Sequence, residues 1–207
     1  MRIHKVIQGT DAWKRIRLGK ITGTRIKNIA KADNLSVVDE LIAETISDEI
    51  EEDGFINEAM QRGIDYEPLA RSEYEKRMNV KVEEFGFLQH SEHDWLGLSP
   101  DGLIKSENGK YEKGIEIKCP STATHVRYIR MNSLPNEYKY QVYNYFLVCQ
   151  DIQTVDFISY DTRFGIKPMH IITIKRDDIQ AELTATNIMI LKFWNEKFKK
   201  YYEQVTF

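Results

Sequence analysis

The sequence predicts a mixed α/β fold in which a central mixed β-sheet is flanked by helices. Helical patterns fill the first third of the chain and short strand-like segments fill the middle. Two helices, two strands and a last helix follow, an order typical of a sheet covered by helices. The chain has 207 residues, 42% of them hydrophobic, and we find no internal repeat or linker. A single domain over 1–207 is therefore expected.

The first third predicts four helical segments. A short helical turn covers 13–19, and Thr and Gly cap candidates introduce a second helix over 22–29. Ser36 with Asp39 three residues later forms a capping-box pattern, followed by apolar residues at helical spacing up to residue 54. The segment 57–78 predicts a further helix, although it contains a glycine and a proline.

Strands and helices share the remainder of the chain. Strand-like patterns occur at Val80–Gln89, Trp95–Leu98, Gly102–Ile104, Tyr111–Cys119, Val155–Tyr160 and His170–Ile174. Helices are predicted at 122–131, at 136–150 and from Asp177 onward.

Charges are segregated along the chain, although the net charge is only -3. Residues 12–32 carry seven basic side chains and no acid, and 33–61 carry ten acids and no Lys or Arg. One end of the molecule can therefore face a polyanion, although a solvated charged surface gives the same pattern. No apolar run exceeds four residues, against the ~20 of a membrane span. Two cysteines cannot build a disulfide framework, so we expect a cytoplasmic protein without a membrane partner.

The segment Gly114–Pro120 contains the most informative pattern. Ile115, Ile117 and Cys119 alternate with Glu116 and Lys118, so a strand would bury the first three and place the carboxylate and the ammonium together on its other face. An exposed hairpin would show the same alternation.

A hairpin that starts at the preceding Pro-Asp turn can bring Asp101 beside Glu116. Two close carboxylates repel each other unless a cation lies between them, and Mg2+ prefers such oxygen ligands. The main-chain carbonyl of Ile117 can face the same cation, and Lys118 can hold or polarise one of its waters.

Pro-Asp, a spacer and Glu-x-Lys together form the signature of the PD-(D/E)xK nuclease superfamily. The Pro-Asp lies in Ser99–Gly102, and three further segments agree in order and rough spacing: Arg17–Thr24, Gly63–Glu67 and Tyr140–Tyr143. With Glu116–Pro120 they resemble the phage-type lambda exonuclease family, also called YqaJ-like viral recombinases or phage alkaline exonucleases. The resemblance spans about residues 10–175.

This resemblance implies a role for each matching residue. It implies that Glu67, Asp101 and Glu116 hold two Mg2+ ions, for which Mn2+ can substitute, together with the Ile117 carbonyl. Lys118 matches the catalytic lysine that orients or activates the attacking water. The pocket for a 5′-terminal phosphate is implied to consist of Arg17, Thr24, Ser99 and Gln141. The family usually has serine at the position of Thr24, and the hydroxyl is retained.

The resemblance further implies an exodeoxyribonuclease that digests one strand of linear double-stranded DNA from a 5′-phosphorylated end, 5′ to 3′. The remaining 3′ single strand would serve phage-type recombination with a single-strand annealing protein, in the cytoplasm of a bacterial host. A ring-shaped homotrimer around DNA is also implied. Phosphate contacts position without reading bases, so we expect little sequence specificity.

Two alternatives stay open, a PD-(D/E)xK endonuclease and a DNA-binding recombination scaffold without catalysis. An iron–sulfur relative would need four cysteines, and the chain has two.

Other candidate residues are weaker. His90 and His93 have no third ligand and are expected to face solvent. Tyr138, Tyr140, Tyr143, Tyr145 and Phe146 could stack on bases, but part of this series is expected in the core. Cys119 is expected to pack and not to act as a nucleophile.

Overall fold

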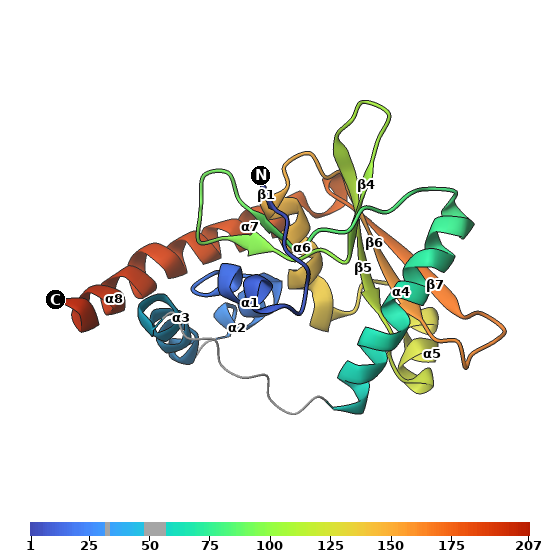
Figure 1. Ribbon diagram of the computed structural model, residues 1–207, viewed down its shortest axis with the longest axis horizontal. Coiled ribbons are helices and arrows are strands. Elements are labelled where there is room, and N and C mark those ends of the chain that lie inside the picture. The colour runs from blue at the N-terminus through green and yellow to red at the C-terminus, as the bar shows by residue number, and fades with distance from the viewer. Residues whose placement is uncertain (32–33, 48–56) are drawn as a thin grey trace.

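The computed structural model describes residues 1–31, 34–47 and 57–207 (Figure 1). Its strands are β1 Arg2–His4, β2 Phe87–Gln89, β3 Gly97–Leu98, β4 Gly102–Lys105, β5 Tyr111–Lys118, β6 Thr154–Tyr160 and β7 Met169–Lys175. The α-helices are α1 Asp11–Arg17, α2 Gly23–Ile29, α3 Leu35–Ser47, α4 Glu58–Met78, α5 Thr122–Met131, α6 Lys139–Val148, α7 Gln180–Lys192 and α8 Lys199–Thr206. Two 3-10 turns, η1 Asn136–Tyr138 and η2 Asp177–Ile179, and a π-helical segment, η3 Phe193–Phe198, complete the order.

The strands form two sheets. The order β4-β5-β6-β7 makes a mixed four-stranded sheet, in which β5 and β6 are parallel and the other neighbours are antiparallel. The expected central mixed sheet flanked by helices is thus confirmed. A smaller antiparallel sheet, β1-β2-β3, stands beside it. Strand β1 has only three residues and an exposed Ile3, so it shows no alternation that a sequence pattern could detect.

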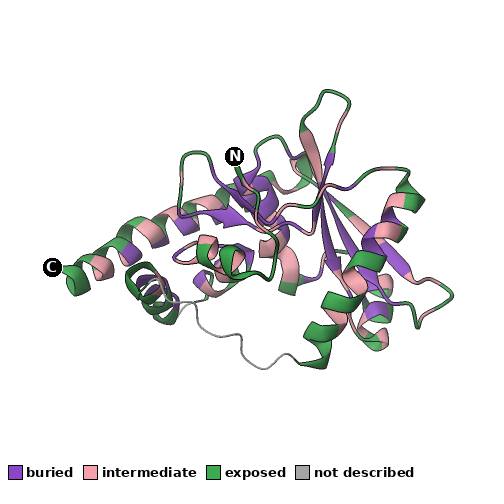
Figure 2. Ribbon diagram, in the orientation of Figure 1, coloured by how far each residue is buried: buried purple, intermediate pink, exposed green. Residues whose placement is uncertain are grey.

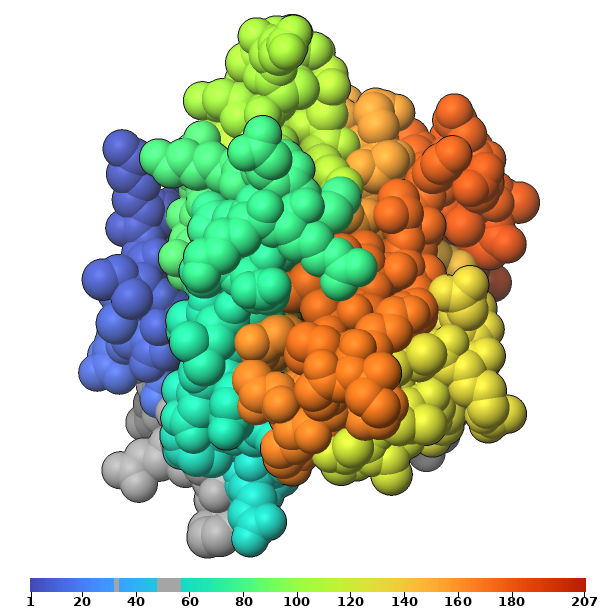
Figure 3. All heavy atoms as spheres, turned by 90° about the vertical axis from the view of Figure 1, so that its right-hand side faces the viewer, coloured from blue at the N-terminus to red at the C-terminus, as the bar shows by residue number. Residues whose placement is uncertain are grey.

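Helix α4 covers one face of the four-stranded sheet, and Figure 3 shows it lying across the molecule next to β7. The helix starts where the sequence predicts. Asn57 is its N-cap, and the Asn57 side chain accepts hydrogen bonds from the N–H groups of Ala59 and Met60. In the middle of the interface the Tyr74 hydroxyl donates to the buried carboxylate of Asp156 on β6 at 2.6 Å. This bond holds the helix, and therefore any side chain one or two turns earlier, at a set position over the sheet.

Helix α6 covers the opposite face and separates the two sheets (Figure 1). Tyr145 is fully buried there, and its ring lies against Gly114 of β5, where an added Cβ would come within 2.5 Å of the ring. Figure 2 shows the strands of the four-stranded sheet largely buried between these helices. The central strands thus have both faces covered, as buried parallel pairs require.

The C-terminal helices extend from this body and are attached to it by stacked rings. Trp95 stacks on Trp194 at 4.7 Å between centroids, and His93 stacks on Trp95 at 5.1 Å. His90, which is 9% exposed, stacks on His93 at 4.9 Å. The expectation that both histidines face solvent was therefore wrong for His90, because the rings pack into this stack.

Two further boundaries differ from the sequence prediction. Helix α3 begins at Leu35, so Ser36 lies inside the first turn and is not the cap, and the predicted continuation to residue 54 lies outside the described residues. In the predicted strand Val80–Gln89 only β2 is a strand, and Glu83 forms an isolated bridge to Leu103. Among the helices that the structure describes, none is long and apolar enough to cross a membrane.

Candidate functional site

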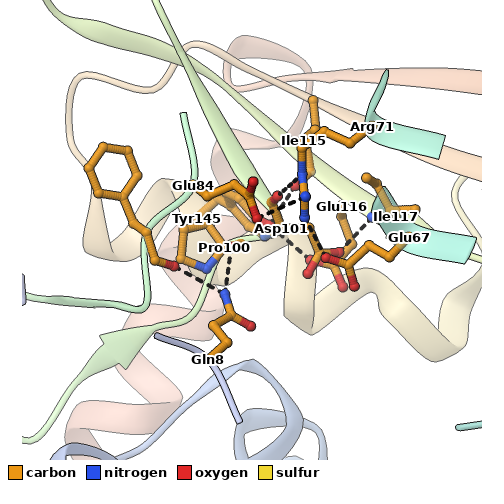
Figure 4. Close-up of polar contacts among 11 residues, drawn as sticks. Gln8, Glu67, Arg71, Glu84, Pro100, Asp101, Ile115, Glu116, Ile117 and Tyr145 are labelled. Carbon is orange, nitrogen blue, oxygen red and sulfur yellow. Dashed lines mark hydrogen bonds and ion pairs between the residues drawn. The ribbon is translucent and has the colours of Figure 1, made fainter. Parts of the chain in front are cut away.

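Three acidic side chains approach one another where β4 and β5 stop pairing (Figure 4). Glu67 comes from α4, Asp101 from the turn before β4, and Glu116 from β5. The last β4 pairing is Gly102 with Ile115, which leaves Asp101 beside the end of β5. We call Glu67, Asp101 and Glu116 the carboxylate cluster.

The open edge of β5 explains how Asp101 is held. Its carboxylate accepts a hydrogen bond of 2.7 Å from the main-chain N–H of Ile117. The N–H and C=O of one strand residue point to the same side, so the Ile117 carbonyl faces this edge as well. The hairpin that the sequence predicts therefore does bring Asp101 to Glu116.

Burial and like charges make the cluster electrostatically unfavourable by itself. Glu116 is 3% exposed, and its carboxylate lies 2.6 Å from the Lys118 ammonium. Burial and the carboxylates of Glu116 and Glu67 raise the pKa of Asp101 well above its usual value, and burial also raises the pKa of Glu67. Burial alone would lower the pKa of Lys118, but Glu116 and Asp101 outweigh it and raise that pKa. Lys118 is therefore an ammonium at neutral pH.

The donor set fits a hard divalent cation. Carboxylate and carbonyl oxygens are the ligands that Mg2+ prefers, and a cation would relieve the repulsion inside the cluster. As the side chains are arranged, no three His, Cys, Asp or Glu residues in the described segments stand close enough together to hold an ion. Positive side chains face the carboxylates instead, Lys118 at Glu116 and Arg71 at Glu67.

Arg71 belongs to the site but was not predicted from the sequence. Its guanidinium donates to Glu67 at 2.6 Å, to Glu84 at 2.8 Å and to the Asp101 carbonyl at 3.0 Å (Figure 4). It thereby joins α4 to the Pro-Asp turn. One sequence feature could have indicated it. Arg71 follows Glu67 by four residues in a predicted helix, a spacing that places the two side chains next to each other.

Tyr145 is a second missed residue. Its hydroxyl oxygen accepts from the Asp101 N–H at 3.0 Å and lies 2.6 Å from the Ile115 carbonyl and 3.0 Å from the Glu116 carboxylate. Helical spacing predicts part of this aromatic series in the core, and Tyr145 and Phe146 are buried there. Helical spacing shows which side chains are buried but not what a buried hydroxyl contacts.

The four residues expected at a terminal phosphate lie together on one side of the cluster. Arg17, Thr24, Ser99 and Gln141 line a hollow of about 70 Å³, and Glu116 of the cluster lines it too. We call this the small hollow. It is far below the roughly 300–1,000 Å³ of pockets that take whole small molecules, so it suits a single anion.

Aromatic and hydroxyl contacts hold Arg17 at the small hollow. Its guanidinium donates to the Ser99 hydroxyl at 2.8 Å and lies over the Trp13 ring, 4.1 Å from the centroid. The Trp13 indole N–H also reaches the Ser99 hydroxyl, at 3.0 Å. Burial and the nearby charge of Arg25 lower the pKa of Arg17 to about 10, so it remains a cation at neutral pH.

Close backbone approach brings the other side of the small hollow together. Gly23 at the start of α2 lies against Gln141 of α6, where an added Cβ would come within 2.8 Å of the Gln141 Cα. Glycine at this position thus lets Thr24 and Gln141 share one hollow. Two larger hollows flank the site, one of about 320 Å³ beside Glu67 and Asp101 and one of about 520 Å³ beside Lys27 and Lys31.

Comparison with known proteins points to one family. The model of the YqaJ-like viral recombinase domain matches residues 12–151. An uncharacterized protein of Acanthamoeba polyphaga mimivirus is 39% identical over 70 residues, which are 31% of this chain and only 13% of the viral protein.

Solved structures show the same similarity over almost the full length. An alkaline exonuclease from Laribacter hongkongensis superposes with a TM-score of 0.82 and 32% identity, covering 95% of this chain and 96% of that one. Its complex with dAMP gives a TM-score of 0.79 and 31% identity with the same coverage. A phage-related exonuclease from Haemophilus somnus, with a TM-score of 0.57, 16% identity and coverage of 90% and 94%, shares the fold. The chain belongs to the YqaJ-like viral recombinase family and has the PD-(D/E)xK fold of the alkaline exonucleases.

Proposed function

We propose that this protein is an exodeoxyribonuclease that digests one strand of linear double-stranded DNA from a 5′-phosphorylated end, 5′ to 3′, and leaves a 3′ single strand. One observation carries the proposal: the small hollow, with Arg17 in its wall, shares Glu116 with the carboxylate cluster. A terminal phosphate bound there would place the following phosphodiester near the cluster. The family and the alkaline exonuclease neighbours support this reading.

Glu67, Asp101 and Glu116 would hold the divalent ions that nucleases of this family use, with the Ile117 carbonyl as a further oxygen donor. We propose two Mg2+ ions, for which Mn2+ can substitute. Such ions make the attacking water more nucleophilic and neutralise the leaving oxygen. Lys118, held 2.6 Å from Glu116 and charged, would orient that water beside the phosphate.

Arg17 would bind the terminal phosphate, because its planar guanidinium can donate two parallel hydrogen bonds to phosphate oxygens. The Ser99 and Thr24 hydroxyls and the Gln141 amide would donate the remaining bonds. A terminal phosphate carries more charge and more free oxygens than an internal phosphodiester, so these contacts select the end of a strand.

Several finer properties belong to the same proposal. We propose that 1–207 acts as one exonuclease domain in a ring-shaped homotrimer around DNA, and that a single-strand annealing protein takes up the 3′ strand in the cytoplasm of a bacterial host. Because the basic segment 12–32 and the acidic segment 33–61 are separate, a net charge of -3 is compatible with a basic DNA-facing wall. Mass measurement should give three chains per particle, and monomer alone at working concentration would contradict the ring.

The decisive experiment uses linear duplex labelled on one strand, with and without a 5′ phosphate, beside covalently closed circles, in Mg2+. Loss of the 5′-phosphorylated strand with intact circles is the expected result. Cut circles would indicate an endonuclease, and no digestion in Mg2+ or Mn2+ would indicate a DNA-binding scaffold.

Arg17→Ala tests the small hollow directly. It should reduce the preference for 5′-phosphorylated over 5′-hydroxyl ends by at least about tenfold, since a charged hydrogen bond is worth about 1.5–3 kcal/mol. Arg15→Ala is the matched control, because Arg15 is an exposed arginine of the same helix α1. It should leave the preference unchanged.

A further inference from the structure

Helix α3 contacts the segment that carries Arg17 through one closed set of polar bonds. The Glu44 carboxylate accepts from the Gly19 N–H at 2.8 Å and forms a two-pronged ion pair with the Arg25 guanidinium. Arg25 also donates to the Lys20 carbonyl at 2.9 Å. Glu44, Arg25 and the main chain of Gly19 and Lys20 therefore form a ring of contacts, which we call the Glu44 clamp.

The main chain at Gly19 packs closely against α3. Gly19 has φ +63, the left-handed region that favours glycine, and an added Cβ would come within 2.5 Å of the Thr45 hydroxyl. The turn is also closed by a hydrogen bond from the Lys20 N–H to the Arg17 carbonyl at 3.0 Å. Any movement of α3 would thus shift a turn that begins at Arg17.

The Glu44 clamp reaches two walls of the small hollow at once. One side holds the turn that follows Arg17, and the other holds Arg25, which lies on α2 one residue after Thr24. The Arg25 and Glu44 side chains are only 20% and 24% exposed, so solvent screens their attraction incompletely. Glu44 also offsets part of the positive charge that Arg25 presents to Arg17. Arg17 lines the small hollow, whereas Arg25 is paired with Glu44.

We propose that Glu44 and Arg25 are positioning residues for the 5′-terminal phosphate, so that α3 sets the end specificity of the enzyme. The proposal rests on the proposed function of the small hollow. It assigns a role to one acid of the acidic segment, Glu44. Neither Glu44 nor Arg25 needs to touch DNA for this role.

The test variant is Glu44→Gln, which keeps an acceptor for the Gly19 N–H but loses the charge that pairs Arg25. We expect the preference for 5′-phosphorylated over 5′-hydroxyl ends to fall by about tenfold or more, since a displaced Arg17 would lose charge-assisted hydrogen bonds to the terminal phosphate, which are roughly twice as strong as neutral ones. KM for phosphorylated ends should rise while kcat changes little. In EDTA, anisotropy should show the same loss of discrimination between 5′-phosphorylated and 5′-hydroxyl duplexes, independently of catalysis.

Matched variants separate positioning from a general effect. Glu40→Gln removes an exposed acid of α3 one turn earlier and should behave as the unmodified protein. Arg25→Gln, alone and combined with Glu44→Gln, should give equal losses, because two partners of one clamp are not additive. If the Glu44→Gln protein does not fold, Arg25→Lys serves as the test variant in its place, since lysine keeps the charge but cannot make the two-pronged contact with Glu44.

The outcomes distinguish the two proposals. Unchanged discrimination in folded Glu44→Gln, with discrimination lost in Arg17→Ala, would overturn the role of the Glu44 clamp and leave the proposed function intact. An unmodified protein that digests both kinds of end equally would overturn the phosphate site and the clamp together.

Discussion

The Tyr145 hydroxyl accepts a 3.0 Å hydrogen bond from the main-chain N–H of Asp101 while lying 3.0 Å from the Glu116 carboxylate. One fully buried side chain of α6 thus contacts the main chain of Asp101 and the carboxylate of Glu116, two members of the carboxylate cluster. Gln141, one turn earlier on the same helix, lines the small hollow. Helix α6 therefore links the hollow to the carboxylates.

Tyr145→Phe should weaken metal binding without unfolding the protein. It leaves the ring in place against Gly114 but removes the partner of the Asp101 N–H, at an expected ~1–3 kcal/mol of stability. Groups that orient metal ligands typically affect metal affinity or activity by about 10–100-fold. We expect that loss in Mn2+ titrations followed by electron paramagnetic resonance. The matched control is Tyr111→Phe. Tyr111 lies at the other end of β5, where its hydroxyl donates to the Glu83 carboxylate, so this variant loses a similar bond and should bind Mn2+ normally.

Lys118→Ala should abolish digestion and retain DNA binding. The ammonium lies 2.6 Å from Glu116, where it can orient a water, and it is one of many positive charges available to bind DNA. Misplacing a reacting group can cost on the order of 100-fold in rate, so loss of the ammonium that orients the water should slow strand digestion by at least about that factor. Lys175→Ala, an exposed lysine at the end of β7, serves as the control. Equal activity of the two variants would exclude a catalytic role for Lys118.

Divalent ions should stabilise the protein more at higher pH. The pKa of Asp101 is raised by burial and by Glu116 and Glu67. A carboxyl whose pKa is higher in the folded state costs stability once the pH exceeds its unfolded value. In EDTA the melting temperature should therefore fall as pH rises from about 5 to about 8, and Mg2+ should raise it more at the upper end.

Asp101→Asn is the matched change for this thermal measurement. Its amide oxygen can still accept from the Ile117 N–H, but the buried charge is gone. We expect the metal-free variant to be at least as stable as the unmodified protein near pH 8 and to lose the Mg2+ shift. If Mg2+ raised the melting temperature of both proteins equally, the ion would bind outside the carboxylate cluster.

Binding to duplex DNA should weaken steeply with salt. Contacts to phosphates release counterions, so log K falls with log salt by about 0.9 for each phosphate contacted. Titrations of unrelated duplexes in EDTA at several salt concentrations should give similar slopes and affinities, because phosphate contacts carry no base information. A slope near zero, or strong preference for one sequence, would contradict phosphate-dominated binding.

Local patterns predicted most of the elements. Asn57 marked the start of α4, and the alternation around Glu116 and Lys118 predicted the faces of β5, because both signals lie within one segment and follow its periodicity. Three-residue β1 and the stacked His90 were not predicted. Strand β1 pairs with a segment more than 80 residues away, as Arg2 and Gln89 show. The ring stack that buries His90 continues through His93 and Trp95 to Trp194 near the C-terminus.

The sequence by itself determined the order of the helices and strands after β1, the family motifs and the separation of basic from acidic segments. Only the tertiary structure decided that Arg71 and Tyr145 join the carboxylate cluster and that Glu44 holds the turn after Arg17. The physical reason is that periodicity sets the direction of a side chain relative to its own helix or strand. Which group a side chain contacts depends on how its element packs against another one. Here α4, α6 and α3 each pack against segments that are distant in the chain.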